Sequence, residues 1–291
     1  MTTQPSWLVI GQGALGSLMA VHLAKIGQRV TVKLRSAHPE PLTIMHDNQP
    51  WSFPCSATLT QPSTIFAAVK AYHVRPLLDE LQQAPAFAAS TLILSYNGML
   101  EDEASLLRPS DCHWVTTHGA YHDGLEVIHG GHGESWLGGC DQPPAAFETL
   151  AQALPPLHWH AEIHQRRWQK LAVNCLINPF TVLHQCRNGE VLERLDHAVW
   201  HAVATEIAAL AATQGLQLQA DELLANAQRV MQQTAQNRSS MLQDFRLGRR
   251  LEIDYLNGFV AQASATAGLD APANDWVWRR VNALSQDRDL Q

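Results

Sequence analysis

The stretch WQKLAVNCLINPFTVL, residues 168–183, combines side chains that could act on a carbonyl compound. Lys170, Asn174 and Asn178 recur at every fourth position, so on a helix they would lie along one face. An ammonium group and two amides there could bind carbonyl and hydroxyl oxygens, while the leucines between them pack inward. The alternative is an ordinary polar face in contact with solvent. Against it, asparagine is a poor helix former and is costly to place twice in a helix interior.

A second stretch, at residues 11–16, could bind the phosphates of a dinucleotide. It contains three glycines, follows an apolar run at Trp7–Ile10 and precedes a helical pattern. A strand, a glycine loop and a helix in this order are typical of a dinucleotide-binding site. The first glycine permits a tight turn, the second lets a pyrophosphate approach the backbone, and the third lets helix and strand pack. The helix N-terminus would offer free N–H groups. A strand–helix turn without a ligand is the alternative. The loop consists of Gly11, Gln12, Gly13, Ala14, Leu15 and Gly16.

The strand that follows this helix ends on two basic residues. Dinucleotide-binding folds usually place an acidic residue there to hold the ribose 2′-hydroxyl, but no Asp or Glu lies between Gly11 and Glu40. Lys33 and Arg35 stand at this end, and Arg35 could clamp a 2′-phosphate through its planar guanidinium. The alternative is that one of these two side chains is only solvated at the end of the strand and binds no phosphate. The pattern favours NADP (NADPH) over NAD.

Helices and strands must position these groups, and the pattern of apolar residues along the chain changes near residue 163. The first part alternates short β-rich and helical runs, which predicts βαβ units and a parallel sheet. The later part is rich in alanine and leucine at helical spacing, with Gly215 and Gly268 where helix C-caps are expected. We therefore predict an α/β fold: a Rossmann-type dinucleotide-binding domain over residues 1–163, followed by an all-helical domain over 164–291. The expected parallel strands are Trp7–Ile10, Arg29–Leu34, Ile65–Val69, Thr91–Ser95 and His113–Thr117, with an antiparallel extension at Leu125–His129 and Ser135–Gly138. The expected helices are Trp168–Leu183, Asp196–Thr213, Asp221–Gln236 and Arg249–Ala267.

Composition narrows the class of protein. No run approaches the eighteen or so apolar residues of a membrane helix, and the first residues lack the basic start of a secretion signal. The net charge of −7 gives no reason to expect nucleic acid as a partner. The five cysteines are odd in number, widely spaced and without a CxxC pair, so we expect reduced and mostly buried thiols. A cytoplasmic protein, monomer or homodimer, is predicted.

Further motifs make the chain resemble the ketopantoate reductase family over nearly its whole length. The matching pieces are GQGALG at 11–16, VKAY at 69–72, YNGM at 96–99, KLAVNCLINP at 170–179, SSMLQD at 239–244 and EIDYLNGF at 252–259. Together the later motifs are far less expected by chance than a glycine loop. The family reduces the ketone of ketopantoate with NADPH to give pantoate, a precursor of pantothenate and coenzyme A.

The resemblance implies roles for individual residues. Lys170 would be the general acid; its ammonium would stabilise the oxygen that becomes anionic on hydride arrival and then donate a proton. Glu252 would lie near the nicotinamide ribose and could hold this ammonium in place, raising its pKa. The implied cofactor-binding residues are the loop 11–16, Arg35, Lys70, Asn97, Ala120 and Glu252. The implied substrate-binding residues are Asn97, Lys170, Asn174, Asn178, Asn188 and Ser240.

Alternatives remain at the level of sequence. The enzyme could reduce another branched 2-keto acid, or the chain could be a non-catalytic NADP-binding redox sensor. A sensor would not need the side chains of Lys170, Asn174, Asn178, Ser240 and Glu252. The histidines of LHWHAEIH (157–164) and THGAYHDGLEVIHGGH (117–132) include an H-x-H pattern typical of zinc sites. No implied role falls on them and the expected chemistry needs no metal, so we predict loop or surface histidines and no metal site.

Overall fold

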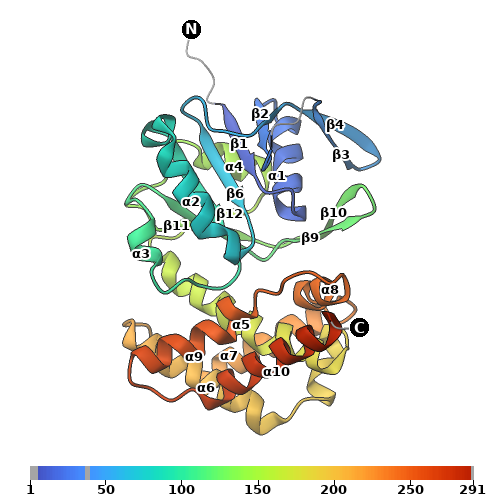
Figure 1. Ribbon diagram of the computed structural model, residues 1–291, viewed down its shortest axis with the longest axis vertical. Helices are drawn as coiled ribbons and strands as arrows, with labels where there is room; N and C mark the ends of the chain where they lie inside the picture. Colours follow the sequence, from blue (N-terminus) through green and yellow to red (C-terminus); the bar gives the residue numbers. More distant parts are fainter. Residues whose placement is uncertain (1–5, 37–39, 290–291) are drawn as a thin grey trace. The chain divides into compact units, whose positions relative to one another are not determined.

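The structure is a computed structural model that describes residues 6–36 and 40–289. Its backbone contacts divide the chain into two compact units. The sheet unit runs to Tyr96 and includes Ala104–Arg166, and the helical unit consists of Asn97–Glu103 and everything from Arg167 on. Within the described ranges, no helix is long and apolar enough to cross a membrane. The α/β order predicted from the sequence is confirmed (Figure 1).

The larger sheet is built on a parallel core with the order β12-β11-β8-β7-β6-β1-β2-β5. β1 pairs in parallel with β2 on one side and β6 on the other, so the direction of winding reverses at β1. β11 pairs antiparallel with β8, which confirms the extension predicted at Ser135–Gly138. The strands are β1 Trp7–Ile10, β2 Val30–Lys33, β5 Cys55–Ser56, β6 Thr64–Ala68, β7 Thr91–Ser95, β8 Cys112–Thr116, β11 Ser135–Gly138 and β12 Leu157–Trp159.

A smaller sheet, not predicted from the sequence, has the order β4-β3-β10-β9. The second predicted extension, Leu125–His129, lies here as β10 rather than in the larger sheet, because it forms a hairpin with β9. α1 contacts strands of both sheets and buries Leu18, Met19 and Leu23 between them (Figure 1). The strands are β3 Leu42–His46, β4 Gln49–Phe53, β9 Gly119–Asp123 and β10 Glu126–Gly131. The helices of the sheet unit are α1 Ala14–Lys25, η1 Ala71–His73, α2 Val74–Gln83, η2 Pro85–Ala89 and α4 Phe147–Ala153, and α3 Glu103–Leu106 begins at the boundary.

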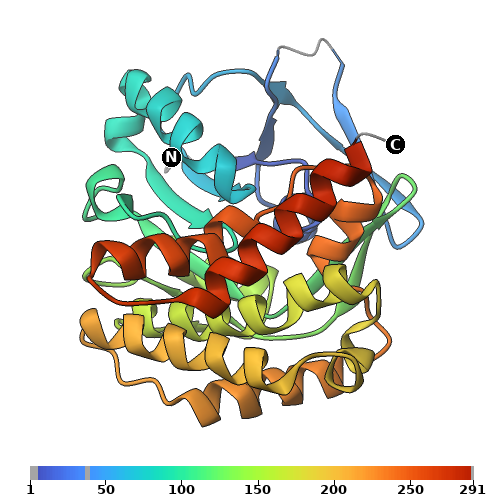
Figure 2. The same ribbon diagram turned by 60° about the horizontal axis from the view of Figure 1, so that its bottom comes forward.

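The helical unit is arranged around α5, whose apolar face enters one buried core with α6, α7, α9 and α10. α6 packs on α7, α9 and α10, and α9 packs on α10 (Figure 2). Gly215 and Gly268 have φ values of 77° and 73°, which confirms them as left-handed residues at helix ends. The elements are α5 Ile163–His184, η3 Asn188–Glu193, α6 His197–Thr213, α7 Ala220–Gln233, α8 Ser240–Arg246, η4 Ile253–Tyr255, α9 Asn257–Thr266 and α10 Pro272–Asp289.

The helix predicted at Arg249–Ala267 is wrong over its first part, because α9 begins only at Asn257. Tertiary bonds hold the preceding segment in another conformation. The Asp254 carboxylate accepts hydrogen bonds from Trp278 Nε1 at 2.8 Å and from Asn282 Nδ2 at 3.3 Å. The backbone here forms only the 3-10 turn η4, and the Tyr255 carbonyl oxygen accepts from Met99 N at 2.9 Å.

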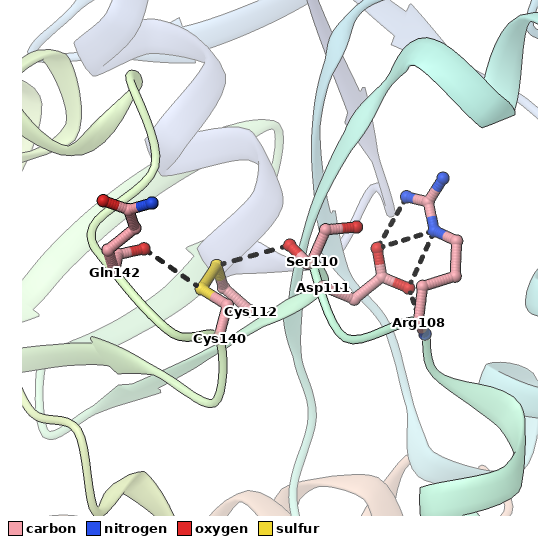
Figure 3. The surroundings of a disulfide bond; sticks show 6 residues. All are labelled: Arg108, Ser110, Asp111, Cys112, Cys140 and Gln142. Carbon is pink, nitrogen blue, oxygen red and sulfur yellow. Dashed lines mark hydrogen bonds and ion pairs between the residues drawn. A yellow bond between two sulfur atoms is a disulfide. The ribbon is translucent and has the colours of Figure 1, made fainter.

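The expectation of five reduced cysteines is also wrong. Cys112 and Cys140 form a disulfide that joins the start of β8 to the turn after β11 (Figure 3). The antiparallel pairing of these strands brings the two Cα atoms to 5.5 Å, within bonding range, although 28 residues separate them in the chain. Cys175 and Cys186 are buried free thiols, and Cys55 is a half-buried one.

Removal of this disulfide should destabilise the sheet unit. Closing a loop of this length restricts the unfolded chain by about 3–4 kcal/mol, so reductant or Cys140→Ser should lower the free energy of unfolding by up to that amount. Denaturant unfolding with and without reductant measures the loss, and Cys55→Ser is the matched control. Thiol titration of denatured, never-reduced protein should find three thiols. Finding five would contradict the bond.

Candidate functional site

The glycine loop after β1 has the geometry that a phosphate group requires. Gly11 has φ 106°, and a Cβ there would lie 2.0 Å from the carbonyl oxygen of Ala68. A Cβ on Gly16 would lie 2.1 Å from the Gly11 oxygen, whereas a Cβ on Gly13 would meet nothing within 4 Å. The loop is therefore packed where strand and helix approach and open at the N-terminus of α1. The first turn of α1 has no acidic residue, so its N–H groups can receive an anion.

Other residues expected to bind the cofactor surround this loop in the sheet unit. Lys70 follows β6 and caps η1, and Ala120 lies on β9, a strand that packs against α1. His122 on the same strand places Nε2 3.3 Å from the carbonyl oxygen of Gln12. The β9 hairpin and the glycine loop thus lie side by side.

The two basic residues at the end of β2 differ in their surroundings. Lys33 is buried, and its ammonium forms a 2.8 Å ion pair with Glu80 of α2. Arg35 lies near the surface, with Nη2 2.6 Å from Nε2 of His73. Only Arg35 of the two is therefore placed to receive a phosphate from solvent.

The stripe predicted on residues 168–183 lies on α5. Leu171, Leu176 and Ile177 are buried, as the periodicity predicted. Lys170 and Asn174 are half-buried, and Asn178 is 9 % exposed. Within residues 6–36 and 40–289, neither side-chain amide of the two asparagines has a hydrogen-bond partner. Amide groups without partners in the protein can bind the oxygens of a ligand at little cost.

The loop after β7 brings Asn97 into the helical unit beside Glu252. The Asn97 amide donates from Nδ2 to Oε2 of the buried Glu252 at 3.3 Å. Gly98, with φ 83°, lets the loop approach Tyr255, because a Cβ there would lie 2.2 Å from the Tyr255 oxygen. Met99 then donates its N–H to the same oxygen at 2.9 Å and enters the helical core. Sequence motifs separated by some 155 residues are thereby joined.

The charge of Lys170 is set by burial and by two neighbours. Burial lowers the pKa of its ammonium to about 8, Glu252 opposes this shift, and Arg167 adds to it. Arg167 is itself buried and pairs with Glu103 at 2.5 Å. The expectation that Glu252 raises the lysine pKa is confirmed in direction, but burial outweighs it. Lys170 remains mostly protonated at neutral pH and gives up its proton more readily than an exposed lysine.

Two hydroxyl groups that the sequence did not single out connect α8 to α5. Thr181 and Ser239 are buried with their oxygens 2.6 Å apart, and Thr181 Oγ1 also lies 2.6 Å from the Asn178 carbonyl oxygen to which it donates. Ser239 also caps α8 by accepting from Leu242 N at 3.0 Å. Its neighbour Ser240, predicted to bind substrate, is the exposed first residue of α8 and is carried toward α5 by this chain of bonds. A serine before a short helix is a capping signal that could have drawn attention to Ser239.

Asn188 is engaged elsewhere in the helical unit. It is buried, donates from Nδ2 to Thr234 Oγ1 at 2.9 Å and bonds through its backbone to Asn237. Its Oδ1 is buried without a partner. The structure thus gives its amide a role in holding η3 against α7, and substrate binding by Asn188 stays a prediction.

Several histidines cluster in the sheet unit rather than lying on loops alone. The rings of His118 and His129 lie 5.0 Å apart, those of His129 and His132 4.3 Å apart, and His22 and His46 adjoin them. Burial lowers the pKa of His22 and His118, and lowers that of His129 to about 4. In the part of the chain that the structure describes, no three ligating side chains are arranged to hold a metal ion.

The arrangement in the helical unit can bind a small oxygen-rich molecule and protonate it. Lys170 supplies an acid of lowered pKa, two amides supply donors, and Glu252 with Asn97 supplies a fixed acceptor. The sheet unit supplies a separate anion-binding loop.

Two family models match most of the chain. Residues 7–142 match "Ketopantoate reductase PanE/ApbA", and residues 162–285 match "Ketopantoate reductase PanE/ApbA C terminal". Proteins named 2-dehydropantoate 2-reductase are similar over nearly their full length. The one from Vibrio cholerae is 34 % identical over 96 % of this chain and 97 % of its own, and the one from Archaeoglobus fulgidus is 30 % identical over 95 % and 96 %.

Solved structures share the fold. A PanE/ApbA family ketopantoate reductase from Ralstonia eutropha has a TM-score of 0.82 at 23 % identity, covering 98 % of this chain and 99 % of its own. D-mandelate dehydrogenase in complex with NADH has a TM-score of 0.84 at 20 % identity, covering 97 % and 99 %. At these identities the likeness shows the fold alone.

The opposing effects on Lys170 can be measured directly. The chain has four lysines, at 25, 33, 70 and 170, so ¹³C-dimethylation gives four lysine signals beside that of the terminal α-amino group, which titrates near pH 8 in most proteins. One lysine signal should also titrate near pH 8, and Lys170→Arg should remove that signal and leave the α-amino signal in place. Glu252→Gln should lower that pKa further, by about one unit, because the nearby negative charge is lost. A Lys170 signal that titrates above pH 10 in the unmodified protein would contradict the burial described above.

Proposed function

The chain belongs to the ketopantoate reductase family of oxidoreductases, and on that premise we propose that it reduces 2-dehydropantoate (ketopantoate) to pantoate with NADPH. The observation that carries this proposal is the Lys170 ammonium of lowered pKa beside the buried Glu252–Asn97 pair. Pantoate formation is a step toward pantothenate and coenzyme A. We also propose that the enzyme is cytoplasmic and works as a monomer or homodimer.

Lys170 acts as the general acid. When bound, NADPH would supply a hydride for the ketone carbon, and the carbonyl oxygen would then gain negative charge. The ammonium stabilises that charge and transfers one proton, so ketone, hydride and proton give the hydroxyl group. Lys170 is left as a neutral amine and regains its proton from water. A pKa of about 8 suits this task, since the acid is charged at neutral pH yet not too weak to donate.

The neighbouring groups bind and orient the keto acid. Asn174 and Asn178 donate to its oxygens from the same face of α5, and Ser240 adds a hydroxyl from α8. Glu252 accepts from the hydroxyl end of the substrate and keeps the Lys170 ammonium charged. Asn97, fixed by its bond to Glu252, lies at the nicotinamide edge.

The sheet unit holds the cofactor. The loop 11–16 and the N-terminus of α1 receive the pyrophosphate, and Arg35 receives the 2′-phosphate. Lys70 and Ala120 complete the cofactor contacts. The residues fit this group because the loop has free space at Gly13 and because no acidic residue precedes the basic end of β2.

Removing the acid should abolish most of the rate. Lys170→Ala should lower kcat by about 10²–10⁴-fold, because the lost interaction develops mainly in the transition state. NADPH affinity should stay unchanged, since the cofactor residues named above for its phosphates lie in the sheet unit. Lys170→Gln, which can donate a hydrogen bond but no proton, should be nearly as slow. A folded Lys170→Ala protein with near-normal kcat would show that Lys170 is not the general acid. Assays of the unmodified protein with a panel of 2-keto acids test the choice of substrate.

Cofactor preference should depend on Arg35. Arg35→Ala should weaken NADPH binding by about 10- to 100-fold, the value of a hydrogen-bonded charge pair, and leave NADH binding nearly unchanged. Fluorescence titration of both cofactors measures this. Equal affinity of the unmodified protein for NADPH and NADH would refute the choice of NADPH.

A further inference from the structure

The contact between Arg35 and His73 fixes the protonation state of this histidine. Arg35 Nη2 lies 2.6 Å from His73 Nε2. A guanidinium has only donors, so Nε2 must be the acceptor and must carry no proton. His73 is therefore a neutral imidazole, with its proton on Nδ1, as long as this contact persists.

His73 lies in the segment that joins β6 to α2, between Lys70 and Arg75. Its backbone N–H donates to the carbonyl oxygen of Lys70 at 2.8 Å, and the exposed Arg75 follows in the first turn of α2. Glu80, further along α2, is paired with Lys33. The Tyr72 ring meets the imidazole edge-on, with centroids 4.5 Å apart. The Arg35 guanidinium in direct contact with Nε2 disfavours an imidazolium in this arrangement.

We propose that His73 is the second group that holds the 2′-phosphate of NADPH, and that it takes up one proton when the cofactor binds. This inference rests on the proposed function, because it requires NADPH to be the cofactor. The 2′-phosphate attracts the Arg35 guanidinium and releases the lone pair of His73 Nε2. The imidazole then gains a proton from solvent and donates it in a hydrogen bond to the phosphate. No covalent bond changes, and the balance is one proton taken up per cofactor bound.

The sign of the proton transfer separates this mechanism from its alternative. The second pKa of a phosphate monoester is about 6, and nearby cations lower it, so a phosphate bound by arginine alone releases protons. Uptake therefore identifies the imidazole. It also makes NADPH binding weaken as the pH rises, by up to about tenfold per pH unit between the pKa of the free histidine and the higher pKa of the bound one. NADH, which lacks the 2′-phosphate, should show no such slope.

The test measures binding without turnover. Calorimetry of NADPH binding in PIPES and in Tris, which differ in ionisation enthalpy, gives the protons taken up, and fluorescence titration gives the affinity from about pH 6.5 to 9. The unmodified protein should take up a large part of one proton with NADPH and none with NADH. His73→Gln should retain NADPH binding but lose both the uptake and the pH slope. His158→Gln, an exposed histidine on β12, is the matched control and should behave as the unmodified protein does.

Each outcome bears on a separate statement. Equal proton uptake in the unmodified protein and in His73→Gln would overturn the role of His73 while leaving NADPH as the cofactor. Binding of NADPH no tighter than NADH at every pH would overturn the proposed cofactor as well. His73→Asn, read alongside circular dichroism, keeps the test valid if the glutamine variant is unstable. Titration with 2′-AMP and 5′-AMP checks that the effect belongs to the 2′-phosphate, because only 2′-AMP should bind with proton uptake.

Discussion

The ammonium of Lys170 loses hydrating water where α5 packs into the helical unit, and Glu252 opposes part of the resulting loss of charge. Burial alone favours a neutral amine, whereas a carboxylate alone would hold the proton too tightly for donation. The compromise depends on a carboxylate that is buried and fixed, and Asn97 provides the hydrogen bond that fixes it. The positive φ of Gly98 and the burial of Met99 serve to bring Asn97 there.

Much of this architecture could be predicted, because the relevant signals are local. Strand, three glycines and helix occur in immediate succession, so the turn at Gly11 follows from short-range sterics. The i, i+4, i+8 spacing of Lys170, Asn174 and Asn178 likewise fixes a shared face once α5 forms. The effect of Glu252 on the Lys170 pKa could be predicted in direction, but the lowered pKa could not, since burial depends on packing from distant segments.

The incorrect predictions concern segments whose structure depends on residues that are distant in the sequence. The segment before α9 is helical by composition, yet Asp254 is drawn to Trp278 and Asn282 of α10. Cys112 and Cys140 look unrelated until antiparallel strands bring them together. The β3–β4 hairpin is different, because its signal was present. Asp47 and Asn48 both adopt positive φ in a two-residue turn, and this residue pair between alternating runs is typical of such hairpins.

The excursion of Asn97–Glu103 into the helical unit also constrains how the protein could be recombined. The chain passes between its units at residues 96/97, 103/104 and 166/167. A chimera made by one splice near residue 166 would join a foreign nucleotide-binding half to a helical half that lacks its own Met99, its own partner for Arg167 and its own Asn97. The two units are therefore exchangeable between relatives only as discontinuous segments, in which the loop Asn97–Glu103 stays with the helical unit that resumes at Arg167.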